Sequence, residues 1–187
     1  MMTGMQWIIA GLGNPGGEYE GTRHNVGREF LEYIEGKDGQ KGKLFGKKAT
    51  VFYPNVYMNN SGGPIKKVVP NKKAAEALVV LHDELDMPLG KVKISYGSSA
   101  GGHNGVKSVQ GALKTRDFVR IRIGISGSTP SGKLKRPAPE KIVDFVLGKF
   151  KPGEQDKLKK ARKIVSEALE LVLTEGKDRA MSEINSR

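Results

Sequence analysis

The side chains best suited to chemistry are the three histidines of the sequence and the polar residues near them. They recur in short segments that follow apolar, strand-like runs, and the carboxyl ends of strands are where ligands bind in open α/β sheets. The chain has no cysteine and no clustered histidines or carboxylates at metal-ligand spacing, so the pattern favours chemistry without a metal ion. The residues concerned are Asn14, His24, Asn25, Asn59, His82, Asp83, His103 and Asn104.

A histidine paired with a carboxylate is the smallest general-base unit. The carboxylate fixes the tautomer and stabilises the imidazolium, while the other ring nitrogen takes a proton from water. His24 with Asp83 is the predicted pair. Asparagine amides around such a base could hold an ester carbonyl and a developing oxyanion, so the set favours hydrolysis by an activated water. The residues alone leave a structural alternative open, because Asn14 before Pro15 suits a turn and Asp83 could cap a helix.

Apolar patterning predicts the elements that must bring these segments together. Residues 77–81 form a short β-branched and leucine run, typical of a strand buried on both faces. Residues 91–96 and 118–125 alternate polar and apolar side chains and are predicted to be antiparallel or peripheral strands. The other strands are expected at 6–10 and 47–53. Helices are expected at 23–35, 61–69, 139–147 and 154–174, and one more is expected to follow the GGHNG segment at 101–105 and continue through Leu113. Strands that alternate with helices predict an α/β sheet with a mixed edge.

Composition limits the class of protein. At 187 residues without a linker, the chain is expected to form one domain, residues 1–187. No apolar run is long enough to span a membrane, and neither a secretory signal nor a cysteine framework is visible, so a cytoplasmic protein is expected. The formal net charge of +12 favours a polyanionic partner, although a solvated lysine-rich surface would give the same number.

Two further segments need interpretation. GLGNPG at residues 11–16 has the glycine spacing of a dinucleotide-binding loop, but Pro15, Gly16 and Gly17 delay the helix that should meet the pyrophosphate, so we reject that alternative. Residues 126–139 are rich in Ser, Gly, Pro and Lys and are predicted to be a mobile surface loop. Lys133 in this loop is a candidate phosphate contact.

Five ordered blocks span nearly the whole chain: GLGNPGGEYEGTRHNVG (11–27), YMNNSG (57–62), HDELDMPLGKVK (82–93), GGHNGVKSV (101–109) and RIRIGI (120–125), followed by FVLGKF (145–150). Together they resemble the bacterial-type peptidyl-tRNA hydrolase family. The resemblance implies a single α/β domain with a twisted, mixed central β-sheet flanked by helices on both sides. It also implies a monomer without a cofactor that hydrolyses the ester between peptide and tRNA.

The resemblance assigns roles to individual residues. The family's catalytic histidine falls on His24 and its partner aspartate on Asp83, while Asn59 is expected at the reacting centre. His82 and His103 are expected to be structural. The expected peptide-binding residues are Asn14, Tyr19, Asn25, Tyr57 and Asn104.

Recognition of tRNA is expected to rest on basic side chains near the cleft. Arg122 matches a position that the family uses for tRNA phosphate, and Lys93 and Lys107 are nearby candidates. Two departures from the family pattern could alter how these basic side chains hold the tRNA. Ser95 stands where relatives often carry a basic residue, and residues 36–42 replace a longer segment.

One alternative of another class remains, a non-catalytic RNA-binding factor on the same fold. The predicted catalytic positions are all occupied by the family's residue types, and the N-terminus lacks an Arg- and Ser-rich transit segment. Both observations favour the enzyme. Residues 1–4 are expected to be a disordered extension.

Overall fold

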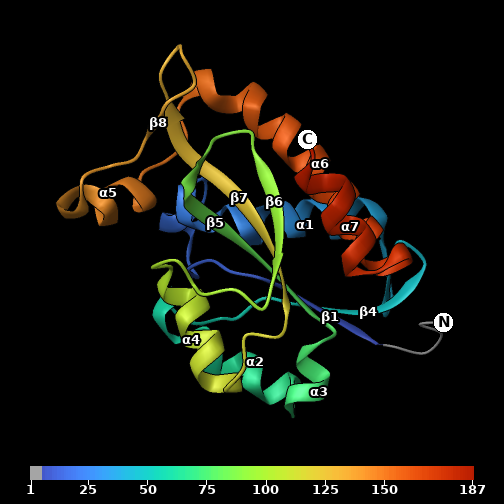
Figure 1. Cartoon of the computed structure of the whole chain (residues 1–187). Helices are drawn as coiled ribbons and strands as arrows, with labels where there is room; N and C mark the ends of the chain where they lie inside the picture. Colours follow the sequence, from blue (N-terminus) through green and yellow to red (C-terminus); the bar gives the residue numbers. More distant parts are fainter. Residues whose placement is uncertain (1–5) are drawn as a thin grey trace.

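A computed structural model describes residues 6–187, so the extension predicted at residues 1–4 lies outside the described residues. The sheet has the strand order β2-β3-β4-β1-β5-β7-β6, with β8 paired to β7 (Figure 1). Strands β4, β1, β5 and β7 are parallel neighbours, whereas β6 and β8 run antiparallel to β7. This mixed sheet confirms the predicted α/β fold. The bounds are β1 Trp7–Gly11, β2 Gly39–Gln40, β3 Lys43–Leu44, β4 Lys47–Phe52, β5 Leu78–Pro88, β6 Val92–Tyr96, β7 Val119–Ser128 and β8 Leu134–Lys135.

Helices cover both faces of the sheet, as predicted. One apolar cluster joins the sheet to α1, α6 and α7, and the other joins its opposite face to α2, α3 and α4. Figure 1 shows α6 and α7 on one side, α2, α3 and α4 gathered on the other, and α5 beside the sheet. The bounds are α1 Val26–Asp38, α2 Gly62–Val68, α3 Lys72–Ala75, α4 Asn104–Leu113, α5 Ile142–Leu147, α6 Gln155–Glu175 and α7 Lys177–Asn185.

Strand β5 is the centre of the molecule and is longer than its apolar run. Leu78 and Val80 pack in one cluster, whereas Val79 and Leu81 pack in the other, so successive side chains enter both cores. The strand then continues through Pro88 because β7 pairs with it beyond Leu81. His82 and Asp83 therefore lie within the strand, not beyond its end as predicted.

Residues 118–125 were predicted to be an antiparallel or peripheral strand. The antiparallel alternative is confirmed by the pairing of β7 with β6, but the strand is not peripheral, because it also pairs in parallel with β5. Residues 126–139 are not an irregular loop throughout: β7 reaches Ser128, and β8 pairs with Gly127 and Ser128 to form a hairpin. That the segment is mobile stays a prediction. Within residues 6–187, no helix is both long and apolar enough to cross a membrane.

Helix α1 crosses β5 at Gly27, and this contact gives a test of the fold. A Cβ atom at Gly27 would lie 2.2 Å from the carbonyl oxygen of Leu81, whereas one at Gly36, later in the same helix, would meet nothing within 4 Å. We expect Gly27→Ala to lower the free energy of unfolding by about 1–3 kcal/mol through overpacking. Gly36→Ala should raise it by about 0.5–1 kcal/mol, because alanine favours a helix. Urea unfolding checks both, and equal effects would contradict the close approach.

Candidate active site

His24 lies on a short turn. Contacts with a distant part of the chain hold this turn in place. It belongs to the 3-10 turn Arg23–Asn25, directly before α1. The buried guanidinium of Arg23 donates to the carbonyl oxygen of Lys149 at 2.9 Å and lies 4.5 Å from the ring centroid of Phe145. The turn therefore has a fixed position although it belongs to no long element.

Asp83 accepts hydrogen bonds from two histidines, one at each carboxylate oxygen. Its Oδ2 lies 2.9 Å from Nδ1 of His24, and its Oδ1 lies 2.8 Å from Nε2 of His103. Because a carboxylate only accepts, both ring nitrogens donate. In His103 the other nitrogen, Nδ1, accepts from the backbone N–H of Val106 at 3.2 Å, so that ring is held as the neutral Nε2–H tautomer. In His24 the other nitrogen, Nε2, has no such partner among residues 6–187.

The electrostatics of this group suit a base. Burial lowers the pKa of His24, but the charge of Asp83 and the hydrogen bond to it outweigh burial, and the pKa is raised. Burial raises the pKa of Asp83, yet His24 and His103 together hold it far below its usual range. Asp83 is only 2% exposed and stays ionised, so it can stabilise an imidazolium on His24.

The predicted substrate residue Asn25 does not face the cleft. It is 3% exposed, its Oδ1 accepts from the backbone N–H of Asn14 at 2.8 Å, and its Nδ2 donates to the carbonyl oxygen of Asn14 at 2.9 Å. Asn25 thus holds the Asn14 backbone instead of a ligand, because both polar ends of its amide are already used. Asn14 in turn accepts from the backbone N–H of Met58 at 2.7 Å, which leaves its Nδ2 as the amide donor for a ligand.

A cleft of about 420 Å³ opens beside His24. Asn14, Asn59 and Asn104 line it, the last two being exposed residues on the turn Met58–Asn60 and at the start of α4. Of the eight predicted catalytic and peptide-binding residues, all but Tyr19 and Asn25 line this cleft. The full lining is Asn14, His24, Tyr57, Met58, Asn59, Asp83, Glu84, Leu85, Gly101, Gly102, His103, Asn104, Arg136, Ile142, Val143, Val146 and Leu147.

Aromatic and apolar side chains form the rest of the rim. Tyr57 lines the cleft and is 57% exposed, while Tyr19 packs edge-on against it with ring centroids 6.2 Å apart and does not line the cleft itself. Helix α5 supplies an apolar wall in which Val143 is 65% exposed. This wall is not predictable from the sequence, because its side chains at 142–147 are apolar and carry none of the groups that mark a reactive site.

His24, Asp83 and His103 are also close enough to be considered as metal ligands, with their ligand atoms within 4.8 Å of one another. Each of these facing atoms is used in a hydrogen bond within the group. A cation would have to displace the proton that each histidine donates to Asp83. The donor set therefore fits a hydrogen-bonded base better than a metal centre.

The predicted tRNA contacts do not gather in the cleft. Arg122 donates from Nη2 and Nε to Glu84 at 2.5 and 2.9 Å and from Nη1 to Ser95 at 3.1 Å, so its charge is already paired. Lys93 lies opposite Arg122 on β6. Lys107 and Lys133 are exposed on α4 and in the turn between β7 and β8.

Comparison with known proteins assigns the chain to a family. The family model for peptidyl-tRNA hydrolase matches residues 8–187. The peptidyl-tRNA hydrolase of Thermotoga sp. (strain RQ2) is 40% identical over 188 residues, 96% of this chain and 97% of that protein. That of Carboxydothermus hydrogenoformans is 37% identical over 192 residues, 96% and 98% of the two chains. The crystal structure of peptidyl-tRNA hydrolase from Acinetobacter baumannii, 32% identical, superposes with a TM-score of 0.81 over 97% of this chain and 95% of that one. The protein whose cleft holds His24 and Asp83 therefore belongs to the peptidyl-tRNA hydrolase family.

Proposed function

We propose that this cleft hydrolyses the ester bond of peptidyl-tRNA with water that His24 activates. The observation that carries the proposal is the 2.9 Å hydrogen bond from His24 to buried Asp83, beside a cleft lined by three asparagines. This bond fixes the proton on Nδ1, so Nε2 is the acceptor for a water proton. The family and its named relatives support the same reaction.

The reaction would proceed in two proton transfers. His24 Nε2 takes a proton from water as the water oxygen attacks the ester carbonyl carbon, and Asp83 stabilises the imidazolium that forms. Asn59 would donate to the oxyanion, and Asn14 and Asn104 would hold the peptide through their amides. When the carbon–oxygen bond to the ribose breaks, His24 returns the proton to the ribose oxygen. The products are a peptide carboxylate and a tRNA with a free ribose hydroxyl.

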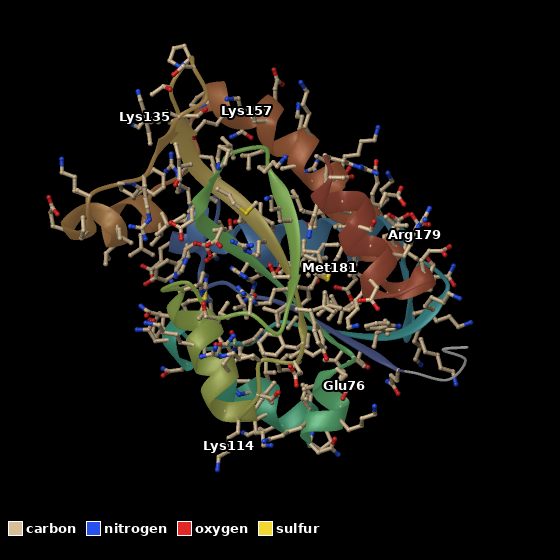
Figure 2. The ribbon with its side chains drawn as sticks, in the orientation of Figure 1. Glu76, Lys114, Lys135, Lys157, Arg179 and Met181 are labelled. Atoms are coloured by element: carbon tan, nitrogen blue, oxygen red, sulfur yellow. The ribbon has the colours of Figure 1, made fainter. Side chains whose placement is uncertain are left out.

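Binding of the tRNA would rest on surface charge. The formal charge of +12 favours the phosphates of the acceptor stem, and Lys114, Lys135 and Lys157 project outward from different elements in Figure 2. Lys93, Lys107 and Lys133 stay candidates for phosphate contacts, while Arg122 would first have to leave Glu84. The proposed reaction needs one copy of the chain and takes place where ribosomes release peptidyl-tRNA, in the cytoplasm.

Peptide release from an N-acetyl-aminoacyl-tRNA tests the function directly. We expect the wild type to release the acyl group in the presence of a metal chelator, and tRNA binding to weaken steeply as salt is raised. Binding and release are measured on the same sample at two salt concentrations. A wild type that binds tRNA but releases nothing would be a non-catalytic RNA-binding factor, and activity lost on chelation would require a metal.

Asn59 offers a separate test of the oxyanion contact. Asn59→Ala should lower kcat by about 100- to 1000-fold, the range for loss of one oxyanion donor. Asn60→Ala is the matched control, because Asn60 is exposed on the same turn and does not line the cleft. Equal rates for the two variants would show that Asn59 does not donate to the oxyanion.

A further inference from the structure

A buried arginine bonds His82, the residue before Asp83, and within residues 6–187 no carboxylate is among its hydrogen-bond partners. Arg120 on β7 is 3% exposed. Its Nη1 lies 3.1 Å from Nε2 of His82, and its Nη2 donates to the hydroxyl of Ser98 and the carbonyl oxygen of Ser99, both at 2.7 Å. Burying a charge that no carboxylate bonds directly costs free energy. Packing alone therefore does not explain why an arginine stands here.

This arginine determines the protonation of His82. Because a guanidinium only donates, Nε2 of His82 must be unprotonated, and the ring proton lies on Nδ1. There it donates to the backbone carbonyl oxygen of Asp83 at 2.7 Å. The ring is fully buried and lies 4.7 Å from the ring of His103. His82 is therefore held as the neutral Nδ1–H tautomer, against the ring of His103, which in turn bonds the Asp83 carboxylate.

The charged surroundings of His82 act in the same direction. Burial, with the neighbouring His103 and Arg120, lowers the pKa of His82 well below its ordinary value despite the opposing effect of Asp83. Arg122 and Glu84 are the other charged groups near the Arg120 guanidinium. Burial and Arg122 lower the pKa of Arg120 to about 10, so it remains protonated at neutral pH.

We infer that Arg120 is a positioning residue of the active site, which keeps His82 neutral and so reserves the Asp83 carboxylate for His24. The inference rests on the proposed function of His24 and Asp83. A protonated His82 would place a positive charge beside Asp83 and compete with the imidazolium of His24 for the same carboxylate. The charge of Arg120 lies on the far side of the His82 ring and competes less.

The same guanidinium also fixes a loop of the cleft. Its contacts with Ser98 and Ser99 hold residues 97–103, which lead into α4 and carry His103. The hydroxyl of Ser98 supplies a bond that a glycine at this position could not. Arg120 therefore links buried His82 to the loop that presents His103 and Asn104.

The wild-type protein alone tests the first part of the inference. Nitrogen-15 histidine spectra distinguish the two neutral tautomers from the imidazolium. We expect His82 to show the Nδ1–H tautomer without titrating from about pH 5 to about pH 9, across the usual histidine range. An Nε2–H tautomer or an imidazolium at His82 would overturn the inference. This result does not depend on hydrolysis, so it is distinguishable from a failure of the proposed function.

The second test is the pH dependence of Arg120→Met. We expect kcat/KM to fall about 10- to 100-fold, as for a small misplacement of catalytic groups. The deficit should grow as the pH falls, because His82 without Arg120 can take up a proton. A deficit equal at every pH would indicate a structural role only and overturn the inference. Arg179→Met is the matched control, since Arg179 projects from α7 away from the cleft (Figure 2).

Ser98→Ala is a milder change that can be measured if the Arg120→Met variant does not fold. Ser98 is exposed and its loss removes a single hydrogen bond to Arg120. We expect kcat/KM to fall by about 2- to 5-fold, the value of one such bond, with the tautomer of His82 unchanged. A wild-type rate in this variant would overturn the role given to the Ser98 bond, because Arg120 would then hold the loop through Ser99 alone.

Discussion

His24→Ala should lower kcat by about 10³- to 10⁴-fold, the upper part of the range for general acid–base catalysis. The upper part applies because one ring both takes the proton from water and returns it to the ribose oxygen. No other histidine can replace His24. Both ring nitrogens of His82 and both of His103 are already in hydrogen bonds, so neither ring has a nitrogen left to accept a proton from water. Single-turnover release of peptide, with enzyme in excess, measures the chemical step.

Two controls separate loss of the base from loss of the fold. The variant should bind tRNA as the wild type does, because the alanine removes no positive charge from the phosphate-binding surface. Added imidazole should restore part of the rate, since His24 borders the open cleft. Unchanged release by His24→Ala would contradict its role as the base.

Asp83→Asn should lower kcat by about 10²- to 10⁴-fold. Asp83 accepts one hydrogen bond from His24 and one from His103, whereas an asparagine amide has a single oxygen. Its NH₂ group would face one of the two histidines and force that ring into the other tautomer or break the bond. If the affected ring is His24, Nε2 carries the proton and cannot act as a base. The pH dependence of the rate and the histidine spectra measure this directly.

Asp117→Asn is the matched control for this change. It makes the same substitution at an exposed residue just before β7, outside the cleft. We expect it to keep the wild-type rate. Comparable losses in Asp83→Asn and Asp117→Asn would show that the carboxylate of Asp83 is not needed for catalysis.

The fold was predictable where apolar side chains are buried and polar side chains are exposed. Residues 77–81 are apolar on both faces and form the central part of β5. A peripheral position for β7 was wrong because arginines in RIRIGI indicate exposure. Arg120 is instead buried, with hydrogen bonds to His82 and to the loop after β6. The hairpin of β7 and β8 was missed because backbone pairing, not apolar patterning, forms it.

The candidate site was predictable in its members but not in their contacts. The resemblance brought His24, Asp83 and Asn59 together, and the structure places all three at one cleft. No spacing in the sequence shows that His103 bonds the second oxygen of Asp83, or that Asn25 is used to hold the Asn14 backbone. Such contacts depend on where the β5 strand and the neighbouring turns meet in space.

The most direct test of the account is to compare the titration of His24, followed by nuclear magnetic resonance, with the pH dependence of kcat/KM. Asp83 raises the pKa of His24, and the neutral imidazole is the active base, so the rate should rise with pH and reach half its maximum above about pH 6.5. The account predicts that the two midpoints coincide. A His24 that titrates where kcat/KM stays constant would contradict it.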